Sequence, residues 1–411
     1  MLRLDRFIAL AIPLAAITFF IACGTSPSSS TSSSSSSGTG SNSVPDYGEG
    51  IGASGQIGPA KFLYANPLPG GGSYALAIQS NGMLTAETSG SANNINPMTM
   101  AIDPTGSYLF QTAQGFNGGT QGGLFAYVIN RSNGSLATAS GSPYMVTQSL
   151  FADVVDNAGK FIYVQGESGV YGFSIQSGGA LTPVSGSPFS IAGPPSSPGF
   201  PTPAHLMAVD QLNRYLYVST SAGISAYTMD PSTGQLAPIS GSPFGTNVSG
   251  PWTITVTPND SFLYELQSTN AGMMYGYHID SSSGALKALS GSPFNVGTCG
   301  TSMLGTPGPD NITIPSAGNF MYTNCGIYSL DNATGAVAQV SNFVSGDWPV
   351  IDPTGNFLWA ITAQQNCFQC DIGVTTYQVD ANSGSLTAVP NSFFLLTNSE
   401  VGSVDSLAIT E

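Results

Sequence analysis

Short apolar segments alternate with turns rich in Gly, Ser and Asp along most of the chain, and one aromatic segment recurs. Seven times an aromatic, an apolar and a second aromatic residue follow one another, which is typical of a buried β-strand. These triplets are Phe62–Tyr64, Tyr108–Phe110, Phe161–Tyr163, Tyr215–Tyr217, Phe262–Tyr264, Phe320–Tyr322 and Phe357–Trp359. Seven times a Gly turn also precedes an apolar residue, at Leu84, Leu136, Leu181, Leu236, Leu286, Val337 and Leu386.

Each repeat of this pattern predicts four strands. A unit consists of a first strand, a "DPTG"-type turn, the aromatic strand, a loop, a third strand such as "ISAYTMD", the Gly turn and a last strand. The last strand leads into "SGSPF", which stands at Ser185–Phe189, Ser240–Phe244 and Ser290–Phe294, and as "SGSPY" at Ser140–Tyr144. We expect this phrase to be the turn that carries each outer strand back toward the centre.

Four antiparallel strands repeated about every 45 to 50 residues indicate the blade of a β-propeller. The array opens at Phe62 with the second strand of a unit, and "SVDSLAIT" at 403–410 matches first strands such as "PMTMAID" and "HLMAVD". A C-terminal strand beside the N-terminal blade would close the ring and leave no free sheet edge. The sequence therefore predicts an all-β fold, a seven-bladed β-propeller over residues 61–411.

The first 60 residues have a different composition. Residues 1–22 combine a cationic head with an apolar run, and Cys23 follows directly, which resembles a bacterial lipoprotein signal peptide. Residues 23–60 read as a flexible tether rich in Ser and Gly. We expect an exported protein, lipid-anchored to the cell envelope through Cys23; a secreted protein, or one held by an uncleaved helix, is the alternative.

Charge narrows the possible partners. The chain holds 7 Lys and Arg against 22 Asp and Glu, and without a basic cluster it has no surface for nucleic acid. The five Lys and Arg residues after position 60 all stand beside turns between first and second or third and fourth strands: Lys61, Arg131, Lys160, Arg214 and Lys287. Those turns lie at the end of the ring opposite the channel mouth, so we expect a negative potential at the mouth.

The first strands begin at the predicted mouth, and aligning them gives one column of residues. The column reads Met98, Phe151, His205, Trp252, Asp310, Asp347 and Asp405. We interpret Met98, Phe151 and Trp252 as ligand contacts, and Asp310, Asp347 and Asp405 as ligands for a divalent cation, calcium or magnesium. In the alternative interpretation the Asp residues cap loop ends and the aromatic residues fill the mouth.

Several of these segments resemble one family. "DPTGSYLF", "DPTGNFLW", "ISAYTMDPSTGQLAPISGSPF" and the seven units are similar to the lactonase-type seven-bladed propellers, which include bacterial 6-phosphogluconolactonases. The resemblance implies lactone hydrolysis, and His205 follows Pro203 and Ala204, where the family tends to place Pro and His. Hydrolysis needs a base and an electrophile, and we interpret His205 as the base and the predicted cation as the electrophile. Enzymes of the family are expected to use an Arg near this His, and no Arg stands there in this chain, so a phosphorylated lactone is disfavoured.

Four cysteines remain after Cys23, an even number in an exported protein, which favours disulfides. We predict the pairs Cys299–Cys325 and Cys367–Cys370, with a crossed pairing as the alternative. Two functions stay open for the predicted monomer. The first is hydrolysis of a non-phosphorylated lactone or other cyclic ester; the second is non-catalytic binding of a carbohydrate or a partner protein at the cell envelope.

Overall fold

The computed structural model describes residues 61–67, 73–89, 97–113, 122–193, 205–245, 253–267, 272–297, 311–341, 346–363, 372–397 and 404–410. The chain divides into two units, 1–43 and 44–411, and all of these residues belong to the second. The predicted signal peptide, Cys23 and the tether lie outside the described residues. None of the described segments forms a helix long and apolar enough to cross a bilayer.

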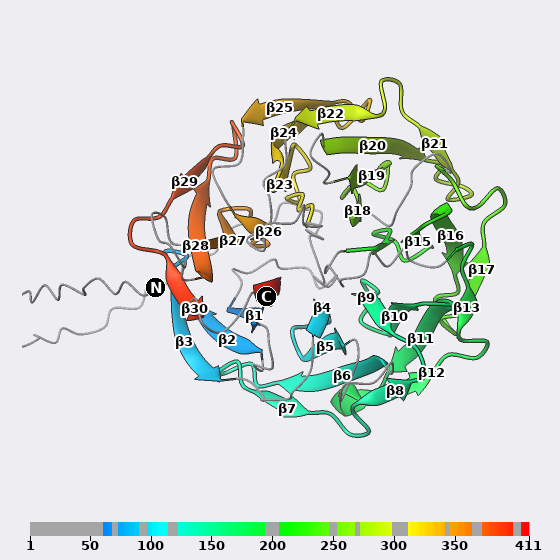
Figure 1. Cartoon of the computed structure of the whole chain (residues 1–411), viewed down its shortest axis with the longest axis horizontal. Coiled ribbons are helices and arrows are strands. Elements are labelled where there is room, and N and C mark those ends of the chain that lie inside the picture. The colour runs from blue at the N-terminus through cyan, green and yellow to red at the C-terminus, as the bar shows by residue number, and fades with distance from the viewer. Residues whose placement is uncertain are drawn as a thin grey trace, which may run out of the picture. The chain divides into compact units, whose positions relative to one another are not determined.

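Within the second unit, seven antiparallel sheets follow one another around a central channel (Figure 1). We number them as blades 1 to 7 in ring order. Blade 1 contains β1 (Phe62–Pro67), β2 (Tyr74–Ile78), β3 (Leu84–Ser89) and β31 (Val404–Ile409). Blade 2 contains β4 (Pro97–Ile102), β5 (Tyr108–Ala113), β6 (Gly122–Ile129), β7 (Leu136–Thr138) and β8 (Tyr144–Val146). Blade 3 contains β9 (Leu150–Val155), β10 (Phe161–Gly166), β11 (Gly169–Ile175), a 3-10 turn at Ser177–Gly179, β12 (Leu181–Pro183) and β13 (Phe189–Ser190).

The remaining blades repeat the same order. Blade 4 contains β14 (Met207–Val209), β15 (Tyr215–Thr220), β16 (Gly223–Met229) and β17 (Leu236–Pro238). Blade 5 contains β18 (Thr253–Val256), β19 (Phe262–Gln267), β20 (Gly272–Ile279), β21 (Leu286–Ala288) and β22 (Phe294–Gly297). Blade 6 contains β23 (Phe320–Thr323), β24 (Gly326–Leu330) and β25 (Val337–Ser341). Blade 7 contains β26 (Asp347–Ile351), β27 (Phe357–Ala363), β28 (Ile372–Val379), β29 (Leu386–Ala388) and β30 (Phe394–Thr397).

The predicted fold class and the predicted closure of the ring are confirmed. Strand β31 pairs with β1 in antiparallel register, with Leu63 opposite Ile409 and Ala65 opposite Leu407. In Figure 1 the C-terminal strand accordingly lies beside β1 at the inner edge of blade 1. In blade 6 the described part of the first strand is a single bridge between Thr313 and Tyr322, so this sheet has three strands.

The expected role of the "SGSPF" phrase is wrong. The phrase interrupts the outermost strand, and in blade 3 both pieces, β12 and β13, pair with the same third strand, β11. The second Ser fills the gap, because the hydroxyl of Ser187 accepts a hydrogen bond from the backbone N–H of Gly172 at 3.0 Å. Ser142, Ser242 and Ser292 accept equivalent bonds at 2.9, 2.9 and 3.0 Å. The repeat thus encodes a break in an edge strand, which limits edge-to-edge pairing.

One contact recurs between neighbouring blades and involves both repeated motifs of the sequence. The second aromatic residue of a triplet donates a hydrogen bond to the carbonyl of the turn Gly in the next blade. This bond joins Tyr64 to Gly134 (2.8 Å), Tyr163 to Gly234 (2.9 Å), Tyr217 to Gly284 (2.9 Å), Tyr264 to Gly335 (2.7 Å) and Trp359 to Gly82 (2.9 Å). The first aromatic ring of the triplet covers the same Gly closely enough to exclude a Cβ atom.

Replacing Gly234 by Ala should destabilise the ring. Gly234 has φ +71°, and a Cβ there would lie 2.5 Å from Cδ1 of Phe161. We expect the free energy of unfolding to fall by roughly 2–4 kcal/mol, from left-handed backbone strain and overpacking together. Gly178→Ala is the matched control, since Gly178 has φ +79° with nothing within 4 Å. Equal losses in the two variants, measured by chemical denaturation, would show that the ring contact contributes nothing.

Removing the hydroxyl of Tyr163 should weaken the joint between blades 3 and 4. We expect Tyr163→Phe to lower the free energy of unfolding by about 1 kcal/mol, because the Gly234 carbonyl loses its bond. Tyr322→Phe is the control, because the buried Tyr322 hydroxyl has no hydrogen-bond partner among the described residues. A loss in Tyr322→Phe as large as that in Tyr163→Phe would contradict this account.

Candidate functional site

The channel has two ends, which we name from the course of the strands. At the mouth end the first strands begin, near His205 and Asp347; at the base end they turn into the second strands, as at 156–160 and 210–214. The five cations lie at the base end, as expected. There Arg214 forms ion pairs with Asp210 at 2.7 Å and Asp260 at 3.2 Å.

The predicted column at the mouth is described in part. Met98 and Phe151 are buried, with 3% and 8% of their surface exposed, and Phe151 packs in the core beside Leu206 and Met207 of blade 4. Trp252 and Asp310 lie outside the described residues. Asp347 begins β26, whereas the side chain of Asp405 in β31 is not described.

The predicted cation site therefore stays a prediction. Among the residues that the structure describes, no group of three or more His, Cys, Asp or Glu is placed to hold a metal ion. The predicted disulfides also stay predictions, because three of their four cysteines are not among the described residues. Cys325 is buried, and Cys299, Cys367 and Cys370 lie outside the described residues.

His205 reaches across the channel to a tryptophan that the column did not contain. The rings of His205 in blade 4 and Trp348 in blade 7 lie 4.5 Å apart between their centroids. Trp348 has φ +52°, a strained conformation for a bulky residue, and its indole N–H donates to the Leu407 carbonyl of blade 1 at 3.0 Å. Burial lowers the pKa of His205 to about 3, so its ring is neutral at pH 7.

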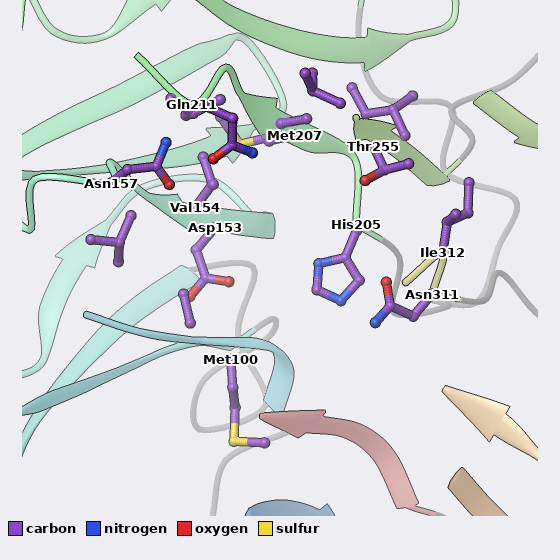
Figure 2. A pocket seen from close by; sticks show the side chains of 16 residues that line it. Met100, Asp153, Val154, Asn157, His205, Met207, Gln211, Thr255, Asn311 and Ile312 are labelled. Atoms are coloured by element: carbon purple, nitrogen blue, oxygen red, sulfur yellow. The ribbon is translucent and has the colours of Figure 1, made fainter. Parts of the chain in front are cut away.

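A cavity of about 80 Å³ adjoins His205 in the channel. Figure 2 shows Asp153 and Asn311 around it together with His205, and Met100 and Met207 on its apolar walls. A water molecule needs roughly 10–15 Å³ of such space, so the cavity has room for several. The side-chain amide of Asn311 is fixed by a bond from its Nδ2 to the Pro349 carbonyl at 2.9 Å.

Asp153 is the carboxyl in the wall of this cavity. It lies in the middle of β9 and exposes 5% of its surface. Its Oδ1 accepts a hydrogen bond from the Thr99 hydroxyl at 2.6 Å, and its Oδ2 has no hydrogen-bond partner among the described residues. Burial raises the pKa of Asp153 to about 7, against the opposing effect of the Thr99 bond. Its carboxyl can therefore both take and release a proton near neutral pH.

A second buried carboxyl, Glu265 in β19, lies at the interface of blades 4 and 5. It is 1% exposed, its Oε1 accepts a bond from the Ser219 hydroxyl at 3.2 Å, and burial raises its pKa to about 7. The sequence analysis did not identify Asp153 or Trp348; it counted Glu265 among the acidic residues of the mouth end and gave it no role at the site. The available signal for Asp153 was an acidic residue inside the apolar strand "LFADVV", two positions after Phe151, where the other blades carry apolar residues or Pro349.

Fold and site together define an all-β ring with a titratable carboxyl and a neutral imidazole in its channel. Residues 67–395 match the model of a family described as lactonase, 7-bladed beta-propeller. The chain belongs to this lactonase family, which confirms the resemblance in its sequence. None of the curated protein sequences compared with this chain matches it.

Solved structures share the fold at low sequence identity. A protein from Lactobacillus plantarum is 18% identical, with a TM-score of 0.66 over 86% of this chain and 100% of that one. A candidate 6-phosphogluconolactonase from Bacteroides uniformis is 15% identical, with a TM-score of 0.64 over 86% and 99%. The periplasmic gluconolactonase of Pseudomonas aeruginosa is 18% identical, with a TM-score of 0.58 over 85% and 99%.

Asp153 should make the stability of the protein fall as the pH rises. The unfolded carboxyl titrates near 3.8 and the folded one near 7, so between these values the folded state binds more protons and rising pH favours unfolding. At pH 8, Asp153→Asn should be more stable than the original chain by an amount on the order of a few kcal/mol; near pH 4 the two should agree. The low pKa of His205 also makes stability depend on pH, and this contribution is the same in both proteins.

Thermal melts from pH 4 to 8 measure this difference. Asp230→Asn is a matched control at an exposed turn, because Asn130 already occupies the equivalent place in blade 2 and makes the equivalent turn bond. A difference between Asp153→Asn and the original chain that does not change with pH would contradict the raised pKa of Asp153.

Proposed function

We propose that this protein hydrolyses a non-phosphorylated lactone or a related cyclic ester in its channel, with Asp153 as the general base. The observation that carries the proposal is the carboxyl of Asp153: the residue lines a cavity with room for water, and its buried Oδ2 atom has no hydrogen-bond partner among the described residues. The family and the lactonase names of two structural neighbours support the reaction class. We assign the base to Asp153 rather than His205, because a pKa of about 3 gives His205 too little proton affinity at neutral pH.

The chemistry follows from these groups. The Oδ2 atom takes a proton from water, the water oxygen bonds to the lactone carbonyl carbon, and the carbonyl electrons move to its oxygen. Collapse of this intermediate breaks the bond to the ring oxygen, and Oδ2 returns the proton to that oxygen, which gives the free hydroxy acid. His205 stays neutral throughout, because its pKa is about 3.

Charge indicates the substrate class. Binding a phosphate group requires Lys, Arg or a helix N-terminus in most sites, and the cations after residue 60 lie at the base end. A neutral lactone needs no such partner, and the apolar wall of Met100, Met207 and Ile254 suits its ring carbons. This charge distribution is the reason to prefer a non-phosphorylated substrate over 6-phosphogluconolactone.

The cellular setting in this proposal is the bacterial envelope, with the lipid on Cys23 as anchor and a monomeric propeller; secretion is the alternative. The calcium or magnesium ion predicted at Asp310, Asp347 and Asp405 would polarise the lactone carbonyl from the mouth. Non-catalytic binding of a carbohydrate or a partner protein is the alternative function, and it requires no proton transfer at Asp153.

Lactone hydrolysis by the purified protein tests the proposal. We expect turnover of neutral lactones, at least 10-fold lower kcat/KM for the 6-phosphorylated analogue, and a loss of at least 100-fold in kcat for Asp153→Asn with little change in KM. Asp230→Asn should keep full activity. The same assay with and without a chelator tests the predicted cation, because a cation that polarises the carbonyl would make kcat fall when it is removed. Full activity in Asp153→Asn would overturn the assignment of the base, and no turnover of any lactone would favour the binding alternative.

A further inference from the structure

Two hydroxyls of the neighbouring blade form a chain of hydrogen bonds that ends on Asp153. Thr99 in β4 donates from Oγ1 to Asp153 Oδ1 at 2.6 Å, and the Oγ1 atoms of Thr99 and Thr112 lie 2.8 Å apart. The backbone N–H of Thr99 donates to Thr112 Oγ1 at 3.2 Å. Both threonines are fully buried. The carboxyl on blade 3 is therefore oriented by blade 2, across the interface between the blades.

The direction of these bonds follows from counting hydrogens. A hydroxyl carries one hydrogen, and that of Thr99 points to the carboxylate. In the pair of hydroxyls Thr112 must then be the donor and Thr99 the acceptor. The bonds run one way, from Thr112 through Thr99 to Oδ1 of Asp153.

This direction distinguishes the two oxygens of Asp153. A proton on Oδ1 weakens that oxygen as an acceptor for Thr99. If this proton points at Thr99, the Thr99 hydrogen must turn toward Thr112, and the Thr112 hydrogen then loses its acceptor in this group. Leaving one buried hydrogen without an acceptor costs about 1–3 kcal/mol. A proton on Oδ2 changes none of these bonds, because Oδ2 has no hydrogen-bond partner among the described residues.

We propose that Thr99 and Thr112 are positioning residues that reserve Oδ2 of Asp153 as the one atom that takes and returns the proton during hydrolysis. The inference rests on the proposed function and adds to it the atom that reacts and the residues that select it. Throughout the cycle Oδ1 keeps its bond from Thr99, so the carboxyl does not rotate between taking the proton from water and giving it to the ring oxygen. The same bond favours the ionised carboxyl and holds the pKa of Asp153 below the value that burial alone would give.

Two substitutions of Thr99 separate the hydroxyl from the shape of the side chain. Thr99→Val keeps the shape and removes the donor, and Thr99→Ser keeps the donor. We expect Thr99→Val to shift the acidic limb of the kcat/KM profile to higher pH by about one unit, which lowers kcat/KM at pH 6 roughly 10-fold. The change should fall on kcat, with KM little altered. Thr99→Ser should restore the limb and kcat. If Thr99 only filled space, Thr99→Val would leave the acidic limb of the profile unchanged, and Thr99→Ser would have no shift to reverse.

A readout without activity separates this inference from the proposed function. The carboxyl carbon of Asp153, assigned in a ¹³C spectrum by its loss in Asp153→Asn, reports the pKa directly. Its titration midpoint should rise in Thr99→Val and return in Thr99→Ser; if Thr99→Val does not fold, Thr99→Ala takes its place. An unchanged midpoint and limb would overturn the role of Thr99 even with Asp153→Asn inactive. If the midpoint rises in Thr99→Val but Asp153→Asn is active, the effect of the Thr99 bond on the pKa of Asp153 is confirmed and the catalytic proposal is overturned.

Discussion

The contact between the aromatic triplet of one blade and the Gly turn of the next is the constraint on which the ring depends. It joins neighbouring sheets rather than strands of one sheet, and its hydrogen bond occurs at five of the seven interfaces between blades. Both motifs take part in each contact. The ring of Phe161 leaves no space for a side chain on Gly234, and the Tyr163 hydroxyl donates a hydrogen bond to the Gly234 carbonyl. The bond from Trp359 to Gly82 repeats the contact where blade 7 meets blade 1, and so it acts together with β31 in closing the ring.

The site exists because these contacts bring separate blades to one channel. Asp153, His205 and Trp348 come from blades 3, 4 and 7. A neighbouring blade fixes two of them: Thr99 of blade 2 bonds to Asp153, and the Leu407 carbonyl of blade 1 accepts a bond from Trp348. The interfaces are apolar where the aromatic triplets meet and polar toward the mouth. There Gln111 donates to Asn66 at 2.8 Å, and Ser219 donates to Glu265. Buried polar groups are tolerated at this level because a neighbouring blade supplies a partner for most of them.

The seven blades and the closing strand could be predicted because their signals are local and repeated. The function of the "SGSPF" phrase could not, because the Ser187 hydroxyl replaces a strand partner on β11 and that replacement has no periodic signature. The aligned column of first-strand residues included His205 but not Trp348, whose ring packs against it. Trp348 follows Asp347 directly, and a shift of register between Asp347 and Val350 turns it toward His205, so strict alternation along the strand gives the wrong neighbour. Asp153 was visible as an acidic residue in an apolar strand, but its raised pKa depends on burial that a single sequence does not state.

One feature of the composition accounts for both the proton affinity of Asp153 and the preferred charge of the substrate. Had a Lys or Arg lain beside Asp153, the pair would have held the carboxyl ionised at neutral pH, and it would have been a weak base. The same cation would have attracted a phosphate group. With the Lys and Arg residues after residue 60 at the base end, burial dominates, the pKa of Asp153 rises to about 7, and no Lys or Arg at the mouth is available to a phosphate group. A buried carboxyl that lowers stability at neutral pH is explained if its proton is exchanged with a ligand or water, since an amide of the same shape would serve packing better.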